Sequence, residues 1–243
     1  MILEFLAEQF IGGRVAACRE VAKDVGEVFR LDAKAAGNEV AIGGWLSRGG
    51  AATRDARWFA VSLNRTNAPW AFARGEPFRT IASLELLGAL VGVMVLLPEA
   101  LFDRPVESTG LVTFGCATDN QGNSYLVDRL MTTKYPLGII LAELCHQCAI
   151  RRASLRARWV PRDENEEADA LTNSDFRHFS PSHRIEVELE KLPFGVLPRL
   201  LERGEEYVSE LAALKQGQSL GHAGAAKRRR LKGEALRDRE PWL

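Results

Sequence analysis

Four acidic residues spread along the chain constrain its fold more than any other feature. Asp32, Glu85 and Asp119 lie in or beside apolar runs, and Asp169 is followed by the apolar pair Ala170-Leu171. An ionised carboxylate in apolar surroundings is costly unless it is paired or bound to a metal. The sequence therefore indicates that these carboxylates have partners that the local sequence does not supply.

The size and charge of the chain set broad limits on its function. Its 243 residues suffice for one large domain, or for one domain with an appendage, and 46% of them are hydrophobic. The formal net charge is zero, so the chain as a whole does not attract nucleic acid. This balance counts against a DNA-coating protein but is compatible with an enzyme that grips phosphate through a local patch.

The N-terminus and the cysteines indicate an intracellular protein. Residues 1–13 contain two glutamates and no basic stretch, which is not typical of a secretory signal. Reduced thiols and a nuclear or cytoplasmic location are therefore expected. The run Cys145-His146-Gln147-Cys148 is half of a metal-site pattern. Packing in a helix core is the favoured interpretation, and metal or redox chemistry remains the alternative.

The most apolar stretch, residues 86–97, is twelve residues long and follows Glu85. That length is too short to span a bilayer. We therefore expect a buried core helix here and no membrane partner.

Hydrophobic periodicity and turn residues predict an alternating order of strands and helices after a helical segment at residues 1–26. We expect strands at 27–33, 40–46, 58–63, 111–117 and 157–160, and helices at 81–97, 120–131, 136–150 and 163–172. Thr80, Asn120 and Asp163 are the expected N-caps of three of these helices. Three sequential strands followed by strands that alternate with helices favour an α/β fold, with a mixed sheet covered on both faces.

Two motifs give the acidic residues a family resemblance. The apolar strand that starts at Val112 ends in Thr118-Asp119-Asn120-Gln121, and Trp159-Val160-Pro161 precedes Asn165-Glu-Glu-Ala-Asp169-Ala-Leu171. Together with the order Asp, Glu, Asp, Asp, these motifs resemble the ribonuclease H family over residues 27–175. The ribonuclease H portion of retroelement polyproteins is the most similar form. The resemblance implies a mixed five-stranded sheet whose first and fourth strands are neighbours, so that Asp32 and Asp119 approach each other.

The resemblance also implies a chemistry. Four carboxylates, Asp32, Glu85, Asp119 and Asp169, would hold two Mg²⁺ ions, with Asp32 bridging and Mn²⁺ able to substitute. The reaction would be endonucleolytic hydrolysis of the RNA strand of an RNA–DNA hybrid, in a protein derived from a retroelement and once joined to a reverse transcriptase. Six residues are candidates for nucleic-acid contacts: Asn120, Gln121, Arg151, Arg152, Arg156 and Arg158. For the arginines, a solvated loop and strand edge is the alternative.

The sequence departs from the family pattern in two places. Many cellular members carry a histidine in the loop before the last helix, whereas residues 161–164 contain none. The first motif reads Leu-Asp-Ala-Lys instead of the common Thr-Asp-Gly-Ser. A catalytically inactive nucleic-acid-binding remnant of the same fold is therefore one alternative. A 3′–5′ exonuclease is another, although its first motif usually pairs the aspartate with a glutamate two residues on, where this chain has Lys34.

The character of the sequence changes after residue 175. We expect a helical appendage at 176–216 and a basic, disordered tail at 217–243, which is rich in Gly, Ala, Lys and Arg. The basic cluster at 227–232 could serve nuclear import or bind nucleic acid, and a simple solvated tail is the alternative.

Overall fold

The computed structural model of the chain describes residues 23–50, 52–72, 76–97, 111–132, 134–199 and 201–202. All of them belong to the first of two compact units, Met1–Glu205.

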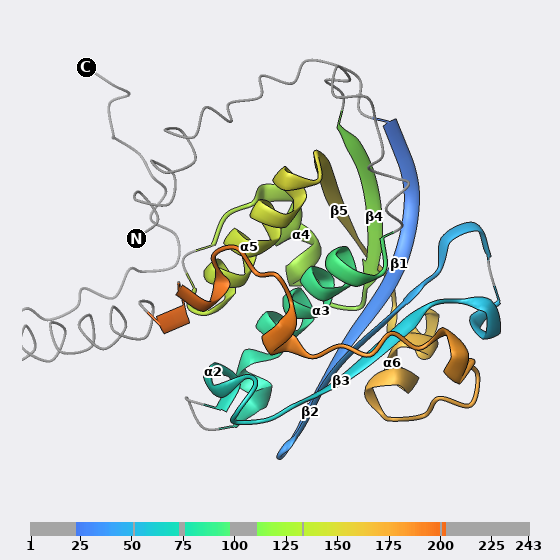
Figure 1. The fold of residues 1–243 in the computed structure, drawn as a ribbon, viewed down its shortest axis with the longest axis horizontal. Helices are drawn as coiled ribbons and strands as arrows, with labels where there is room; N and C mark the ends of the chain where they lie inside the picture. The colour runs from blue at the N-terminus through green and yellow to red at the C-terminus, as the bar shows by residue number, and fades with distance from the viewer. Residues whose placement is uncertain are drawn as a thin grey trace, which may run out of the picture. The chain divides into compact units, whose positions relative to one another are not determined.

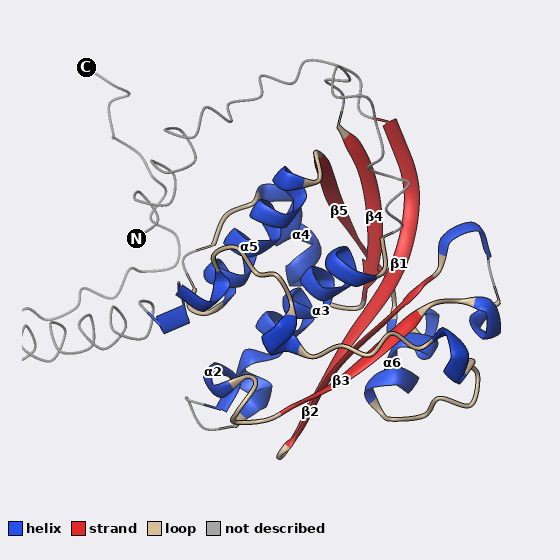
Figure 2. Cartoon of the chain, in the orientation of Figure 1, coloured by secondary structure: helices blue, strands red, loops and turns tan. Residues whose placement is uncertain are grey.

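Five strands form one mixed sheet (Figure 2). They are β1 (Lys23–Ala36), β2 (Glu39–Leu46), β3 (Trp58–Leu63), β4 (Val112–Thr118) and β5 (Ala153–Trp159). Their spatial order is β3-β2-β1-β4-β5. The first three strands pair antiparallel as a meander, while β4 is parallel to both β1 and β5. The predicted α/β class is confirmed, and so is the expectation that the first and fourth strands are neighbours.

Helices cover both faces of this sheet (Figure 1). One face carries α3 (Ile81–Val95), α4 (Gln121–Arg129) and α5 (Leu137–Ile150), and the other carries α6 (Glu166–Thr172). A short helix, α2 (Pro69–Phe72), and the 3-10 turn η3 (Pro77–Thr80) precede α3. The functional consequence is that helices from opposite faces flank β1, the central strand.

The apolar helix α3 is packed into the core of the protein. The segment Pro77–Val95 is long and apolar enough to cross a bilayer by length and composition, but 67% of its most apolar window is buried inside the protein. Gly92 permits close packing here, because a Cβ at this position would lie 2.7 Å from the Phe29 ring of β1. The helix therefore has the burial of a core helix, as predicted.

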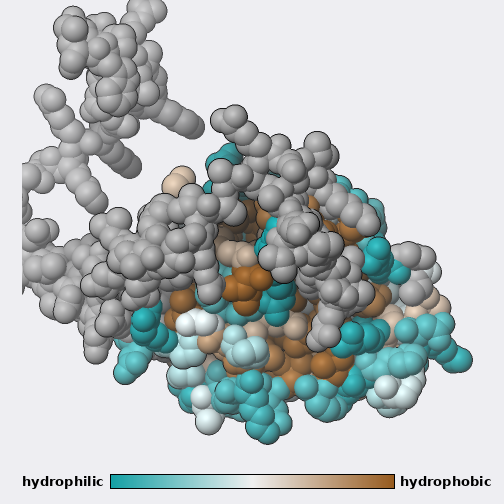
Figure 3. All heavy atoms as spheres, turned by 45° about the horizontal axis from the view of Figure 1, so that its top comes forward, coloured by the Kyte–Doolittle hydropathy of each residue, from teal (hydrophilic) through white to brown (hydrophobic). Residues whose placement is uncertain are grey.

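On the face drawn in Figure 3, hydrophilic side chains border an apolar area of the described surface.

A second, smaller apolar cluster lies beneath α6 on the opposite face of the sheet. Trp45 and Trp58 of the sheet pack there against Leu171 of α6 and against Phe179. The ring centroids of Trp58 and Phe179 are 5.5 Å apart. This cluster fixes α6 against β2 and β3.

Residues 176–197, which we call the C-terminal strap, link the two clusters. After Phe179 the strap passes the edge strand β3, where the Ile185 N–H donates to the Trp58 carbonyl at 2.7 Å. Leu189 and Val196 then pack into the main core. The strap thus pairs with the start of the edge strand β3, whose Trp58 carbonyl would otherwise lack this backbone partner.

A buried carboxylate on α5 holds the end of the strap. Glu143 accepts hydrogen bonds from the backbone N–H groups of Gly195, Val196 and Leu197 at 2.7–3.0 Å. Gln147, one turn farther along α5, donates to the same carboxylate at 2.6 Å. These hydrogen bonds provide the Glu143 oxygens with partners although the side chain is fully buried.

Several predicted boundaries were wrong. Residues 23–26, expected in the helical segment, start β1, and β5 starts at Ala153 and not at 157. Asp163 is not an N-cap: it lies in a 3-10 turn, and α6 begins at Glu166 after Asn165. The strap, expected as part of a helical appendage whose helical run starts at about Val196, is mainly extended and 3-10 in structure before that residue, and residues 197–199 and 201–202 are helical, as expected. The predictions for residues 1–22 and 203–243 lie outside the described residues.

Thr80 does precede α3, but its hydroxyl donates to the Pro77 carbonyl at 2.7 Å and caps no helical N–H. Asn120, in contrast, caps α4 as predicted, because its side-chain oxygen accepts from the Asn123 N–H at 3.1 Å.

Candidate active site

The site forms where two neighbouring parallel strands separate. The parallel register of β1 and β4 extends as far as Arg30 opposite Ala117. Asp32 lies two residues beyond that pair on β1, and Asp119 lies two residues beyond it after β4. Both carboxylates therefore meet in the opening between the strands, where side chains from both faces of the sheet can reach them.

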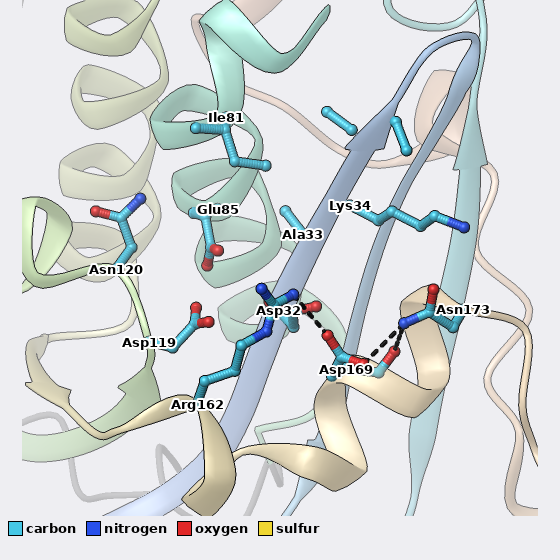
Figure 4. Close-up of a pocket in the computed structure, with 12 residues that line it drawn as sticks. Asp32, Ala33, Lys34, Ile81, Glu85, Asp119, Asn120, Arg162, Asp169 and Asn173 are labelled. Carbon is cyan, nitrogen blue, oxygen red and sulfur yellow. Dashed lines mark hydrogen bonds and ion pairs between the residues drawn. The ribbon is translucent and has the colours of Figure 1, made fainter.

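Glu85 reaches this opening from α3. It is buried, and its carboxylate accepts a hydrogen bond from the Thr118 hydroxyl at 3.0 Å. One carboxylate oxygen from each of Asp32, Glu85 and Asp119 lies within 4.8 Å of the other two. Figure 4 shows the three side chains converging from β1, α3 and the end of β4. Among the described residues, this trio is the group of acidic, histidine and cysteine side chains with metal-binding geometry.

Asp169 approaches the same cavity from α6, on the other face of the sheet (Figure 4). The cavity has a volume of about 470 Å³, and all four predicted carboxylates line it. Thr172, one turn after Asp169, donates its hydroxyl to Asp32 at 2.8 Å. The structure thus brings together all four predicted acidic residues, three of them closely and Asp169 at the rim.

Burial and mutual repulsion disfavour the ionised form of the carboxylates in the site. Burial, together with the nearby carboxylates of Asp119 and Asp169, raises the pKa of Asp32 to about 6 despite the lowering effect of the Thr172 hydroxyl. Burial, followed by Asp32 and Asp119, also raises the pKa of Glu85 well above its usual range. Like charges at this separation disfavour ionisation. The site therefore has an excess of negative charge that a cation would relieve.

Asp169 has one cationic partner and one neutral polar partner. Arg162 donates to its Oδ1 at 2.9 Å, and the Asn173 amide donates to its Oδ2 at 2.8 Å. The hydrogen bond with Asp169 raises the pKa of the Arg162 guanidinium, with smaller contributions from Asp119 and Asp32. Arg162 therefore lies in the field of three of the carboxylates.

Backbone contacts hold the carboxylates in place. The buried Asn165 side chain donates to the Leu31 carbonyl at 2.9 Å, which ties the start of α6 to β1 beside Asp32. The Trp159 indole donates to the Asp119 carbonyl at 3.0 Å. These bonds explain in physical terms why an asparagine and a tryptophan accompany the acidic residues in the motifs.

The predicted nucleic-acid contacts lie in different environments. Asn120 lines the acidic cavity, and Gln121 is exposed at the first turn of α4. Arg156 pairs with Asp24 at 3.5 Å and Arg158 with Glu27 at 2.5 Å, both across the sheet.

Two further arginines lie at the junction of α5 and β5. Arg151 donates to the carbonyl and side-chain oxygens of Gln147. Arg152 occupies the turn that follows, with φ of 51°. Within the described structure, none of the four predicted arginines lines the acidic cavity. Their role in binding nucleic acid stays a prediction.

The cysteine pair has the environment of a packed core. Cys148 is buried on α5, and this burial raises the pKa of its thiol to about 12. Such a thiol is a poor nucleophile and a poor metal ligand at neutral pH.

The sheet order, the parallel β1–β4–β5 pairing and the helices on both faces define the architecture. The fold is ribonuclease H-like. No protein-family model matches the chain, and no curated protein matches it either.

Solved structures offer remote similarities to the chain. RNase H1 from the halophilic archaeon Halobacterium salinarum is 17% identical, with a TM-score of 0.38, over 63% of this chain and 98% of that chain. LC11-RNase H1, isolated from compost by a metagenomic approach, is 18% identical, with a TM-score of 0.43, over 61% and 94%. The same LC11-RNase H1 in complex with an RNA/DNA hybrid gives 17% and 0.42, over 60% and 93%. At these values, activity has to be inferred from the chain's own residues.

Three residues with direct roles in the site were missed from the sequence. Thr172 and Asn173 follow Asp169 by three and four residues, which is the spacing that brings side chains onto one helix face. That spacing could have identified them. Arg162 had no such signal, because its position depends on how the loop before α6 turns back toward the cavity.

Proposed function

We propose that the protein is a metal-dependent endonuclease that hydrolyses the RNA strand of RNA–DNA hybrids. The observation that carries this proposal is the convergence of Asp32, Glu85 and Asp119 within 4.8 Å, with Asp169 at the rim of the same cavity. The carboxylates come from four separate elements of a ribonuclease H-like fold. An arrangement of this kind is difficult to explain by stability, because burial and repulsion raise the pKa of two of these groups.

The donor set fits hard divalent cations. Carboxylate oxygens are the ligands that Mg²⁺ and Mn²⁺ prefer, and the described site offers no sulfur or imidazole ligand. We propose that Asp32, Glu85, Asp119 and Asp169 would hold two Mg²⁺ ions, for which Mn²⁺ could substitute. When bound, such ions lower the pKa of a water molecule and stabilise charge on the phosphate oxygens.

The protein's own contribution is to fix the ligands before substrate arrives. The Thr118 hydroxyl orients Glu85, and the Thr172 hydroxyl orients Asp32. Because these partners are neutral donors, they hold the carboxylates without cancelling the negative charge that a cation needs. Partners of this kind commonly alter metal affinity or activity about 10- to 100-fold when they are removed.

The substrate class follows from the proposed chemistry and the sequence motifs. A hybrid would be recognised by its shape and by 2′-hydroxyls across a wide minor groove. Asn120 lines the cavity beside Asp119 and could reach the backbone of the cleaved strand. We also propose a retroelement origin and a former link to a reverse transcriptase. The support is the form of the motifs around Asp119 and Asp169.

A labelled RNA–DNA hybrid incubated with the protein and Mg²⁺ tests the proposal. We expect internal cleavage of the RNA strand, loss of cleavage with a chelator, and recovery with Mn²⁺. Asp119→Asn should reduce cleavage more than about a hundredfold, since losing a ligand exceeds the effect of losing a ligand's partner. The variant should keep the wild-type circular dichroism spectrum, because the amide preserves the side chain's shape.

The outcomes separate the proposal from its alternatives. Stepwise shortening from the 3′ end, abolished by a blocked 3′ terminus, would identify an exonuclease. Hybrid binding without cleavage in either metal would identify an inactive remnant. Wild-type cleavage by Asp119→Asn would remove Asp119 from the proposed metal site.

A further inference from the structure

Arg162 is the cation that the acidic cavity holds closest to its carboxylates. Two cationic residues line the cavity in the described structure, Lys34 and Arg162. Lys34 forms an ion pair at 2.7 Å with Glu39, a residue that does not line the cavity. Arg162 instead points into the cavity and bonds to Asp169 (Figure 4).

We propose that Arg162 is a substrate-positioning residue: its guanidinium neutralises Asp169 until a divalent cation takes that carboxylate, and it then binds a non-bridging oxygen of the scissile phosphodiester. This inference rests on the proposed function and concerns the same site. In this proposal a single side chain, Arg162, exchanges the Asp169 carboxylate for a phosphate oxygen.

The ion pair is built so that it can be exchanged. The Arg162 side chain is 75% exposed, although Asp169 is only 33% exposed. An exposed ion pair of this kind contributes little to stability, because water and salt screen it. A divalent cation at Asp169 can therefore displace the guanidinium at small cost.

The backbone around Arg162 keeps the released side chain close to the site. Arg162 opens the 3-10 turn Arg162–Glu164, and Arg30 of β1 donates to the Glu164 carbonyl at the end of that turn. Asn165, the next residue, is tied to the Leu31 carbonyl. The turn is thus attached to β1 at two points beside Asp32, so only the Arg162 side chain has to move.

Charge and shape favour a phosphate as the second partner. The planar guanidinium presents paired donors that match carboxylate and phosphate oxygens alike. A phosphodiester that approaches four carboxylates meets repulsion that bound cations offset only in part. A free guanidinium in the same cavity supplies the additional positive charge and two directed hydrogen bonds.

The test compares Arg162→Gln and Arg162→Lys with the wild-type full chain. Arg177→Gln is the matched control, since Arg177 is an exposed arginine paired with Asp175 at 2.6 Å outside the cavity. Mn²⁺ affinity is measured by titration calorimetry without nucleic acid. Hybrid affinity is measured with Ca²⁺ in place of Mg²⁺ at several salt concentrations, with the RNA checked for integrity on a gel.

Opposite effects are expected in the two measurements. Arg162→Gln should bind Mn²⁺ roughly two- to fivefold more tightly, the factor that corresponds to a lost exposed ion pair. It should bind hybrid roughly tenfold more weakly, with a salt slope reduced by about one. Arg162→Lys should keep the salt slope but recover only part of the affinity, because it retains the charge and loses the paired donors. Arg177→Gln should match the wild type in both.

Either missing effect in Arg162→Gln overturns the inference, because the exchange requires both a competitor for the cation and a ligand for the phosphate. If the wild type cleaves hybrid and Arg162→Gln behaves like it, only this inference fails. If the wild type neither binds Mn²⁺ nor cleaves hybrid, the proposed function fails and this inference falls with it.

Discussion

At the scale of single residues, the site is a competition between protons and cations for the same oxygens. Asp32 has a pKa of about 6 because it is buried near other carboxylates. A proton or a divalent cation can relieve this repulsion, and a cation must displace the proton to bind. Metal affinity should therefore increase as the pH rises through 6.

The stability of the metal-free protein should show the opposite pH dependence. The folded pKa of Asp32 exceeds its usual value of 3.8, so the folded state holds the proton more tightly than the unfolded state. Its contribution is fully present below pH 4 and is lost as the pH rises through 6. We expect Asp32→Asn to be more stable than the wild type at pH 7 in chelator, by up to about 3 kcal/mol.

Urea unfolding at pH 4 and pH 7 measures this difference. The advantage of Asp32→Asn should shrink at pH 4, where the wild-type carboxyl is largely protonated. An equal effect at both pH values would show that repulsion at Asp32 does not govern stability.

The acidic residues were predictable and their neighbours were not, for a physical reason. Glu85 and Asp119 stand out because a charge within an apolar run needs an explanation that is visible in the sequence itself. Arg162 and Thr172 act through contacts that exist only after α6 packs on the sheet. A threonine or an arginine on a polar helix or loop carries no comparable local conflict.

At the scale of elements, the position of α6 depends on one glycine of β2. Gly43 lies opposite Asp32 in the sheet, and a Cβ there would lie 2.8 Å from the Leu171 Cβ of α6. Real Cβ atoms do not approach that closely, so α6 would have to shift. That shift would move Asp169 relative to Asp32.

We therefore expect Gly43→Ala to weaken Mn²⁺ binding and hybrid cleavage roughly tenfold or more, since small misplacements of positioning groups are costly. Gly88→Ala on α3 is the matched control. Its Cβ would meet Leu31 at 3.6 Å, an ordinary contact, and it should stabilise the helix by roughly 0.5–1 kcal/mol. Similar activity of both variants would show that the closeness of α6 to β2 does not set the site.

The anchor of the C-terminal strap gives a second prediction at this scale. Glu143→Gln leaves one acceptor oxygen for three backbone N–H groups and places an amide N–H₂ against them. We expect a loss of about 2–3 kcal/mol in urea unfolding, the usual range for hydrogen bonds to charged groups. Glu188→Gln, on an exposed glutamate that pairs with Lys191, should change stability by less than about 1 kcal/mol. Equal stability of both variants would argue against the anchor.

Helices and strands with a clear hydrophobic period were predicted well, but the residues at which they begin and end were not. The strand Trp58–Leu63 and the cap of α4 by Asn120 matched the structure. The start of β5 was missed, because residues 151–156 contain three arginines, of which Arg156 pairs across the sheet with Asp24 of β1. Such pairs stabilise a strand through partners distant in the sequence, which local propensity cannot reveal.

At the scale of the whole molecule, the chemistry and the C-terminal tail should be separable. Truncation at Gly217 removes a basic stretch that follows Asp169 by more than forty residues. We expect unchanged turnover on saturating hybrid, with weaker low-salt affinity for nucleic acid or reduced nuclear accumulation, since phosphate contacts are sensitive to salt. Single-turnover cleavage, binding at two salt concentrations and fluorescence imaging measure these effects. Lost turnover at saturation would show that the tail completes the site.

The path of the C-terminal strap determines the order in which parts of this domain can pack during synthesis. Val196 and Leu197, at the end of the strap, pack into the main core, and they leave the ribosome after all four carboxylates of the cavity. Until residue 185 has emerged, a nascent chain lacks the strap's hydrogen bond to Trp58 at the start of β3, and an open strand edge attracts other chains. Synthesis of this protein therefore includes an interval in which all four carboxylates of the cavity have emerged but the strap that follows them has not yet packed against the sheet.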